Sequence, residues 1–316
     1  MTFDEYETSQ SIKMLYIGNS GSGKTGSLVS LAAAGYQVRI LDLDKGVEVI
    51  KDFVLNPASP YRHDSGLANS LLQGWSPVKG LWSEELGQSI SKRISFVPLD
   101  ETLAVVKIPN SQMKTVPKGD LYSKIQVQFD SWKEGEKSFG SILTWGPDTI
   151  LVIDGLSRFG EAIFNQQLAI GGRLISRPEQ SDYGMGQREL IRNLMLLYSD
   201  AIKCHVIMVC HLDFIETEAG PTKVFPKTNI GKAVAPIIGT FFNHALLAQS
   251  TGQGPAERRI IKTNTSGMIE LKTAAPLRVK GEYSLSTGLA EYFRDVLGRS
   301  GPLPSEGKTE KKEIAK

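Results

Sequence analysis

The sequence has little of what marks secreted proteins or proteins that coat nucleic acid. It contains only two cysteines, Cys204 and Cys210, six residues apart in the apolar run CHVIMVC. If that run is a strand, it is too straight to bring the two thiols together, so no disulfide framework is expected and a reducing compartment fits. Lys and Arg number 36 against 34 Asp and Glu. That balance argues against a wholly basic surface, although it allows a local basic loop.

Long apolar runs are also missing. None approaches the roughly 20 residues that a helix needs to cross a bilayer. The start, MTFDEYETSQS, is acidic and polar, unlike a secretory signal. We therefore expect a soluble cytoplasmic protein. No internal repeat is visible, and 41% hydrophobic residues suffice for a substantial core, in one large domain or two small ones.

What the sequence does contain is an alternation of strand and helix patterns. The apolar runs IKMLYI, YQVRILDLD, TILVIDG and HVIMVC predict buried strands. Between them, KTGSLVSLAAAG and QRELIRNLMLLYSDAIK have helical composition or spacing, and Gly35 closes the first as a C-cap. This order predicts an α/β fold with a mostly parallel central sheet flanked by helices. Ligands of such sheets bind at the carboxyl ends of the strands.

The rest of the chain divides less clearly. We expect a flexible arm over residues 1–11, one domain over 12–298 and a disordered charged tail over 299–316. Residues 52–148 form a poorly legible insertion, in which RISFVPL predicts a strand and DLYSKIQVQFDSWKEG a helix with Asp120 as N-cap. Near the end, NHALLAQS and RRIIKTNT predict two more strands. MIELKT is the expected antiparallel partner of the second, giving a C-terminal antiparallel strand pair.

The stretch GNSGSGKT follows the first predicted strand and has the spacing GxxxxGK[ST]. Its glycines let the backbone coil so that N–H groups form an anion nest, and the helix that begins near Lys24 adds its positive end. Lys24 would reach the β- and γ-phosphates, and Thr25 would bind Mg²⁺. A chance glycine-rich turn is the weaker alternative, because a strand precedes the stretch and a helix follows it. The candidate nucleotide-binding residues are Gly18, Asn19, Ser20, Gly21, Ser22, Gly23, Lys24, Thr25 and Gly26.

A second acidic site follows about 130 residues later, where TILVID places Asp154 at the end of a buried strand. A carboxylate there would hold Mg²⁺ directly or through water.

These features occur in an order that resembles the RecA-like recombinase core, most closely the core-only RecA-like ATPases of bacteriophages, which are associated with single-strand annealing and recombination. The resemblance runs from about Ile12 to Val279 and is poor across 52–148. It implies a P-loop ATPase that binds ATP and Mg²⁺, hydrolyses ATP with water and binds single-stranded DNA. It also implies a phage-encoded protein in the host cytoplasm, with a single-strand-binding protein as a further partner. The sequence lacks the NKxD motif, the LSGGQ signature and an extra lysine early in the loop. These features mark other branches of the P-loop class.

The resemblance assigns two further residues to catalysis. In ILDLDKG, Asp44 matches the position that orients the attacking water, although the family usually has glutamate there. Asp42, on the same side of the strand, is the alternative base, and Asp44 as a cap of the next helix is the other reading. His211, in VCHLDF where the fourth predicted strand ends, matches the residue that senses the γ-phosphate. A strand-end histidine bonded to backbone is its alternative.

Two segments stand where the family binds DNA: RLISRPEQSDYGMGQRELIRNL, with the helix that it enters, and DFIETEAGPTKVFPKTNIGKA. Their cations would meet phosphates and their rings would stack on bases. The acidic residues of the second segment offset its lysines, so two solvated surface loops are the alternative. The candidate DNA-binding residues are Arg173, Arg177, Tyr183, Arg188, Lys223, Phe225, Lys227 and Lys232.

RRIIKTN resembles the strand that presents a cation to the ATP of a neighbouring protomer, with Lys262 the best match and Arg258 or Arg259 as alternatives. The competing account is a basic edge strand that discourages aggregation. The resemblance thus implies a homo-oligomer whose form, ring or filament, stays open. Two other functions are carried forward: a DNA-translocating motor (helicase or packaging ATPase), and a nucleotide switch or kinase that does not act on DNA. A kinase lid would draw on Arg158, Arg173 and Arg177.

Overall fold

The structure is a computed structural model, and a few stretches of the chain fall outside its description. It describes residues 11–54, 84–107, 113–217, 220–231, 233–251, 258–265, 268–285, 287–299 and 301–302. Residues 1–10 of the expected flexible arm and most of the expected tail lie outside these ranges, whereas Ser11 is described and buried. Where the tail begins, the Tyr36 hydroxyl donates a hydrogen bond to the carbonyl of Gly301.

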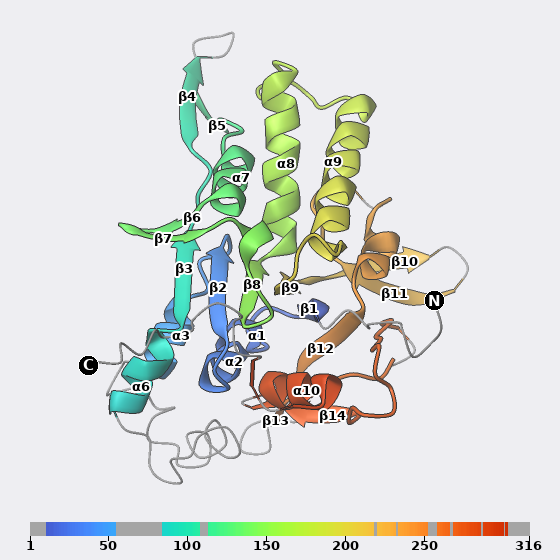
Figure 1. The fold of residues 1–316 in the computed structure, drawn as a ribbon. Coiled ribbons are helices and arrows are strands. Elements are labelled where there is room, and N and C mark those ends of the chain that lie inside the picture. Colours follow the sequence, from blue (N-terminus) through green and yellow to red (C-terminus); the bar gives the residue numbers. More distant parts are fainter. Residues whose placement is uncertain are drawn as a thin grey trace, which may run out of the picture.

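An eight-stranded sheet forms the centre of the described part of the chain, in the order β14-β13-β12-β1-β9-β8-β2-β3 (Figure 1). Six neighbouring strands are parallel, and β13 and β14 add an antiparallel pair at one edge. The predicted α/β fold, with its mostly parallel sheet and antiparallel strand pair, is confirmed. The strands are β1 (Lys13–Gly18), β2 (Gln37–Asp42), β3 (Ile94–Pro98), β8 (Thr149–Asp154), β9 (His205–Cys210), β12 (His244–Thr251), β13 (Arg258–Lys262) and β14 (Glu282–Ser284).

The apolar runs become central strands because both faces of the sheet are covered. Along β1, Met14 and Tyr16 enter the core on one face, while Leu15 and Ile17 enter the core on the other. The same alternation runs along β8 and β9. A strand buried on both faces needs apolar side chains at nearly every position, which explains the unbroken hydrophobic runs.

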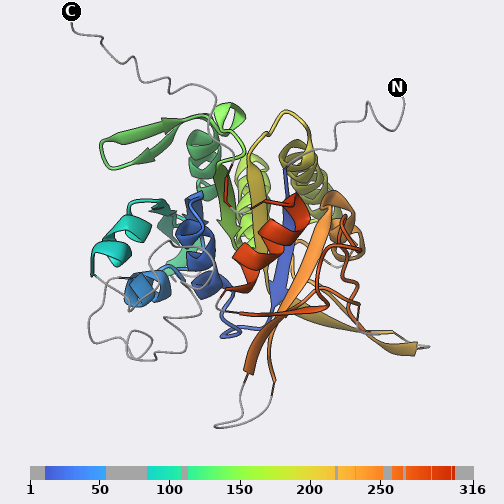
Figure 2. The ribbon, with the colours of Figure 1, turned by 60° about the horizontal axis from the view of Figure 1, so that its bottom comes forward.

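Helices cover the two faces in separate groups (Figures 1 and 2). One group packs on the face that carries Leu15 and Ile17: α7 (Leu121–Asp130), α8 (Leu156–Ile170), α9 (Gln180–Tyr198) and the 3-10 turn η3 (Ala235–Phe241). The other group packs on the opposite face: α1 (Lys24–Ser27), α2 (Val29–Ala33), α3 (Glu48–Val54), α6 (Glu84–Ser91) and α10 (Gly288–Leu297). Gly35 follows α2 with a φ of 105°, the left-handed conformation that its predicted capping role requires.

Three hairpins extend from this framework: β4–β5 (Leu103–Lys107 and Met113–Pro117), β6–β7 (Trp132–Glu134 and Lys137–Gly140) and β10–β11 (Leu212–Thr217 and Gly220–Pro226). The 3-10 turn η2 (Ile142–Thr144) follows β7. Figure 2 shows β10–β11 projecting away from the body of the protein. Within the stretch that was hardest to interpret from sequence, β3 confirms the strand predicted for RISFVPL and joins the edge of the main sheet.

Two local predictions need correction. The helix predicted up to Gly135 ends at Asp130, because the chain turns into β6, where Trp132 is fully buried and donates to Ser95. Asp120 does stand at the N-cap position, but its carboxylate accepts hydrogen bonds from Thr102 and pairs with the Lys124 ammonium instead of capping the backbone of the helix.

The predicted pairing of RRIIKTNT with MIELKT is also wrong. β13 pairs with β12 on one side and β14 on the other, so both of its edges are occupied. Residues 268–273 instead reach the main sheet through one isolated bridge between Lys272 and Ala245. None of the helices in the described ranges is long and apolar enough to span a membrane.

Candidate active site

The glycine-rich stretch forms a tight turn between β1 and α1. Gly21 and Gly23 have φ values of 73° and 92°, a region that residues with side chains rarely adopt. A Cβ atom on Gly23 would also collide with the side chain of Leu285. Ser22 donates its backbone N–H to the carbonyl of Asn19, and its buried hydroxyl has no hydrogen-bond partner among the described residues. A curled loop at a helix start with an unsatisfied polar atom fits an anion such as phosphate.

Lys24 lies inside this turn, with 5% of its surface exposed. Its ammonium donates to the carbonyls of Gly18 and Asn19, each at 2.8 Å. Burial lowers the Lys24 pKa, and the nearby carboxyl of Asp154 opposes that shift. The Lys24 ammonium is therefore bound by two neutral carbonyl oxygens. Charged phosphate oxygens could replace them as acceptors and would form stronger, charge-assisted hydrogen bonds with it.

The two residues predicted to bind metal lie together. Thr25 Oγ1 donates to Asp154 Oδ2 at 2.7 Å, and Asp154 is only 3% exposed. Burial raises the pKa of Asp154 to about 6, with further upward pressure from Asp44 and Asp42, against the hydrogen bond from Thr25. A hydroxyl and a carboxylate that lacks a cation are the hard oxygen donors that suit Mg²⁺.

Asp44 lies directly beside this pair. Its Oδ2 is buried and has no hydrogen bond within the described ranges, and His211 Nε2 is 3.5 Å away. Gly155 allows the carboxylate to sit there, because a Cβ at that position would collide with it. Asp42 closes the turn before α3, because its Oδ1 accepts the backbone N–H of Gly46 at 2.9 Å. The structure thus bonds Asp42 into this turn, whereas Asp44 Oδ2 has no hydrogen bond among the described residues.

These groups converge from neighbouring strands. In the order β1-β9-β8-β2, the carboxyl ends carry the glycine-rich turn, His211, Asp154 and the Asp42–Asp44 pair. The topology explains why residues up to about 190 positions apart in sequence meet at one edge of the sheet.

The β13 strand approaches the phosphate loop from the same chain. Arg259 Nη1 lies 3.8 Å from the point that a Cβ on Gly23 would occupy. Lys262 is half-buried further along the strand, opposite Leu247 of β12 and Glu282 of β14. Arg259 is therefore placed next to the loop of its own chain, a proximity that sequence alone did not indicate. Lys262 as a cation for a neighbouring protomer stays a prediction.

The first segment expected to bind DNA is mostly helical. The α9 helix begins at Gln180, seven residues before the predicted start, so Tyr183 lies on a helix and not in a loop, and Arg188 lies on the helix where it was predicted. The Tyr183 ring stacks on Phe164, with ring centroids 4.6 Å apart. Arg188 is exposed.

A clamp holds the loop that leads into α9. Arg173 Nε donates to Asp182 Oδ2 at 2.9 Å, and the fully buried Asp182 also accepts the backbone N–H of Glu179 in a capping box. Hydrogen bonds from Arg173 lower the Asp182 pKa. Arg173 is therefore engaged within the chain, whereas Arg177 is exposed on the same loop.

The second expected DNA segment contains the β10–β11 hairpin. Lys223 pairs with Ile215 along it, and Phe225, half-buried, stands opposite Asp213. Lys227 follows the hairpin with an exposed side chain, while its backbone N–H donates to the carbonyl of His211 at 2.9 Å. The expected loop is thus largely a strand pair. The alternation of polar and apolar residues in DFIET and TKVFP is the sequence pattern that could have predicted these strands. Lys232 lies outside the described residues.

The two expected DNA segments contact each other. Gln187 Nε2 of α9 donates to the carbonyl of Ile230 at 2.9 Å, and Ile230 is fully buried. Ser157, at the start of α8, donates to the carbonyl of Lys227 at 3.0 Å. A continuous set of contacts therefore joins Asp44 and His211 to the β10–β11 hairpin and α9.

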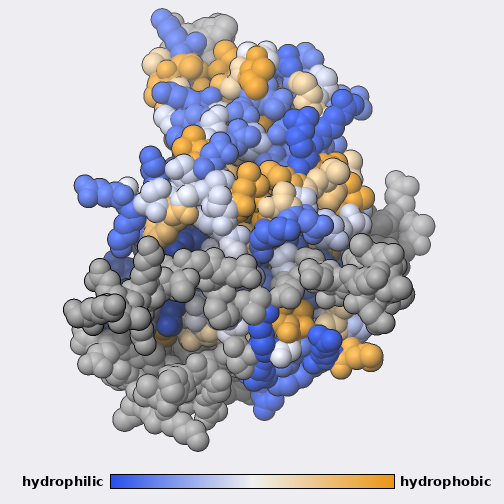
Figure 3. Space-filling view, in the orientation of Figure 1, coloured by the Kyte–Doolittle hydropathy of each residue, from blue (hydrophilic) through white to orange (hydrophobic). Residues whose placement is uncertain are grey.

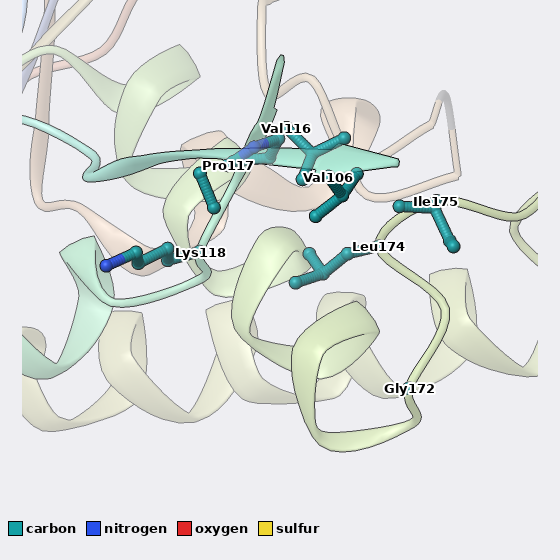
Figure 4. A pocket seen from close by; sticks show the side chains of 8 residues that line it. Val106, Val116, Pro117, Lys118, Gly172, Leu174 and Ile175 are labelled. Atoms are coloured by element: carbon teal, nitrogen blue, oxygen red, sulfur yellow. The ribbon is translucent and has the colours of Figure 1, made fainter. Parts of the chain in front are cut away.

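An apolar cavity of about 380 Å³ lies between the β4–β5 hairpin and the turn that joins α8 to α9. Val106 and Val116 of the hairpin line it together with Leu174 and Ile175 of the turn (Figure 4). Figure 3 shows hydrophobic side chains at the top of the molecule, where Figure 1 places β4–β5 and the end of α8. The hairpin thus supports the loop that carries Arg173 and Arg177, a contact that the sequence did not reveal.

No protein-family model and no curated protein sequence matches the chain. Solved structures give distant likenesses. The RadB recombinase covers 88% of this chain and 89% of its own, with a TM-score of 0.39 and 11% identity. A KaiC-like protein from Pyrococcus horikoshii covers 79% and 78%, with a TM-score of 0.33 and 12% identity. The flagellar accessory protein FlaH from Methanocaldococcus jannaschii covers 86% and 83%, with a TM-score of 0.35 and 11% identity.

Proposed function

We propose that the chain is a RecA-like ATPase that binds ATP with Mg²⁺ at Gly18–Gly26 and hydrolyses it to ADP and phosphate. The observation that carries this proposal is the convergence of Lys24, the Thr25–Asp154 pair and Asp44 at the carboxyl ends of neighbouring strands. A nucleotide in the loop would bring the γ-phosphate to the edge where these groups meet.

Each residue has a role that follows from its surroundings. The loop amides and Lys24 bind phosphate oxygens and stabilise the charge that develops on them. Thr25 and Asp154 would hold Mg²⁺, which neutralises charge on the β- and γ-phosphates. Asp44, with one oxygen that makes no hydrogen bond, orients the attacking water and accepts its proton. His211 is within 3.5 Å of that carboxylate and senses whether the phosphate is present.

Phosphate release tests the ATPase. We expect hydrolysis by the wild type and none above background by Lys24→Ala, because the neutral side chain leaves the phosphates without their buried cation. The exposed Lys137→Ala is the matched control and should keep the wild-type rate. Turnover by Lys24→Ala equal to the wild type would overturn the assignment of the site.

We further propose that single-stranded DNA is the partner and that its annealing or recombination is the coupled activity. The exposed cations Arg177, Arg188 and Lys227 support this, because they lie on segments that contact His211 directly or through α9. Arginine and lysine at such positions bind phosphates without reading sequence. A phage source and a single-strand-binding protein as a further partner belong to the same proposal.

Fluorescence anisotropy with a labelled oligonucleotide tests the DNA partner, with and without ATP. We expect Arg177→Ala and Arg188→Ala each to weaken binding and to reduce the salt slope by about 0.7. Lys137→Ala should do neither. If no single-stranded DNA binds at low salt, or if DNA leaves the ATPase rate unchanged, the DNA proposal fails while the ATPase proposal stands.

We also propose that the protein acts as a homo-oligomer in which Lys262 of one protomer stabilises the phosphates of the next. The test is the specific ATPase rate against protein concentration for the wild type, Lys262→Ala and Arg259→Ala. A rate that rises with concentration and is lost in Lys262→Ala supports the role across protomers. A concentration-independent rate lost only in Arg259→Ala would instead assign the role to the arginine that already lies beside Gly23 in the same chain.

A metabolite kinase is less well supported, because two of its candidate lid arginines are engaged. Arg158 pairs with Glu161 at 3.2 Å, and Arg173 pairs with Asp182. A kinase would transfer the labelled γ-phosphate to an acceptor, whereas the proposed ATPase releases it as free phosphate.

A further inference from the structure

Arg39 is a buried cation that the proposed ATPase does not use. It lies in β2 between Ser95 of β3 and Leu151 of β8, and only 7% of its surface is exposed. Its guanidinium stands 4.1 Å from the centroid of the Phe139 ring. A guanidinium carries five N–H donors, yet within the described ranges Arg39 makes a single hydrogen bond, to Gln37 Oε1 at 3.3 Å, and no ion pair. Most of its donors therefore have no protein acceptor.

The guanidinium lines a cavity of about 380 Å³ that also contains a carboxylate. Its walls are formed by Gln37, Arg39, Phe139, Trp145, Asp148 and Thr149. Asp148 is half-buried and accepts a hydrogen bond from the Thr149 hydroxyl at 3.1 Å, but it forms no ion pair with Arg39. Burial lowers the Arg39 pKa, and the charges of Glu134 and Asp148 act in the opposite direction. Opposite charges that share a partly buried cavity without pairing are costly to maintain in an empty site.

The apolar part of the cavity wall consists of two aromatic rings, Phe139 and Trp145, while Gln37 and Thr149 add polar groups. The indole N–H of Trp145 already donates to the carbonyl of Phe139 at 2.8 Å, so its ring presents no unsatisfied donor to the cavity. Phe139 supplies a second aromatic wall. A volume near 380 Å³ is at the small end of ligand pockets, which span roughly 300–1,000 Å³.

The cavity is separate from the nucleotide site. Gln37 and Thr149 are the first residues of β2 and β8, whereas Asp42 and Asp154 are the last residues of the same two parallel strands. A six-residue strand spans roughly 17–20 Å, so the two sites lie at opposite edges of the sheet. The Asp148 carboxylate would also repel a polyphosphate, which makes a second nucleotide a poor fit.

We propose that this cavity binds a free α-amino acid. Arg39 takes the carboxylate through its planar fork of donors, and Asp148 takes the ammonium group. The side chain of the ligand lies against Phe139 and Trp145, so an apolar or aromatic amino acid fits best. Such a zwitterion satisfies both unpaired charges at once, which neither a simple anion nor a simple cation does.

The first test uses the twenty free L-amino acids in a thermal-shift screen of the full chain, followed by calorimetry. We expect saturable binding of L-phenylalanine or a similar apolar amino acid. For comparison, 3-phenylpropanoate lacks the ammonium group and 2-phenylethylamine lacks the carboxylate, and each should bind about 10- to 100-fold more weakly than L-phenylalanine. No shift with any of the twenty amino acids at millimolar concentration would overturn the proposal, and so would equal binding of 3-phenylpropanoate.

The second test assigns the binding to this cavity. Arg39→Met and Asp148→Asn should each reduce affinity at least tenfold. Arg192→Met, the same change at an exposed arginine of α9, should leave it unchanged. Lys24→Ala, which disables the proposed nucleotide site, should also keep the affinity, so the two proposals can fail independently. If Arg39→Met does not fold, Asp148→Asn alone decides, and wild-type affinity in that variant would refute the role of the carboxylate.

Discussion

Replacing Asp44 with asparagine distinguishes the roles of the two carboxylates at the end of β2, Asp42 and Asp44. Asparagine has nearly the same shape as aspartate but cannot accept a proton from water. The Asp44 carboxylate has a buried oxygen without a hydrogen bond, so the substitution breaks no observed hydrogen bond of the fold. We therefore expect Asp44→Asn to fold and to bind ATP at least as tightly as the wild type, because it removes a negative charge near the phosphates.

The expected loss is in the chemical step. A positioned general base is worth about 10²–10⁴ in rate, so the barrier should rise by about 2.7–5.5 kcal/mol and kcat should fall by that factor. Asp42→Asn is the matched control. Its side-chain oxygen can still accept the N–H of Gly46, and burial raises the pKa of Asp42, so the neutral amide should fold at least as well as the wild type.

Single-turnover phosphate release, with affinity from a fluorescent ATP analogue, measures both effects. The reasoning requires Asp44→Asn to be slow with intact affinity, and Asp42→Asn to keep a rate within about threefold of the wild type. If Asp42→Asn were the slower variant, the base would be Asp42 and not Asp44. If both variants hydrolysed ATP at the wild-type rate, neither carboxylate would orient the water.

Three further predictions concern stability, each measured by denaturant or thermal unfolding without ligand. Folding raises the pKa of Asp154 from about 3.9 to about 6, so the folded state binds the proton more tightly and loses stability as pH rises through that window. Asp154→Asn should therefore be about 2–3 kcal/mol more stable than the wild type at pH 7.5, with no gain below pH 4. A destabilised variant would contradict this. Burial lowers the pKa of His205 to about 3, so its neutral ring contributes stability above pH 6.5 that is lost on acidification. The difference in unfolding free energy between the wild type and His205→Gln should shrink by about 2–3 kcal/mol between pH 7.5 and 4.5. A difference that stays constant over this range would refute the prediction. Arg173→Ala should lower Tm more than Arg177→Ala, because only Arg173 is bound to the buried Asp182; equal Tm values would show that the clamp does not stabilise the loop.

The parts of the site that follow apolar strands could be predicted from sequence. The glycine-rich turn and Asp154 each come directly after a run that must be buried on both faces, and the parallel sheet then brings them to one edge. Strand ends therefore fix position even when the residues are far apart in the chain.

Other features depend on contacts that no local pattern records. The resemblance placed Tyr183 in a DNA-binding loop, but the capping box at Glu179 and the packing of Gly186 against Ile230 favour a helix. Likewise, β14 has only three residues and no recognisable strand pattern in the sequence. The longer MIELKT was therefore predicted as the partner of β13 in its place.

Arg39 is the clearest case. Inside YQVRILDLD it reads as one charged residue in an apolar strand. Its burial follows from Phe139 and Trp145, about 100 residues later in the chain, so the cavity appears only in the folded structure.

Calorimetric titration of ATP in the presence of Mg²⁺ tests the nucleotide site most directly, with the wild type and Lys24→Ala compared at equal concentration. Saturable uptake of one nucleotide per chain by the wild type, absent from Lys24→Ala, is the predicted result. A folded wild-type protein that takes up no ATP, or a Lys24→Ala variant that binds it with wild-type affinity, would contradict the assignment of the glycine-rich turn as a phosphate loop.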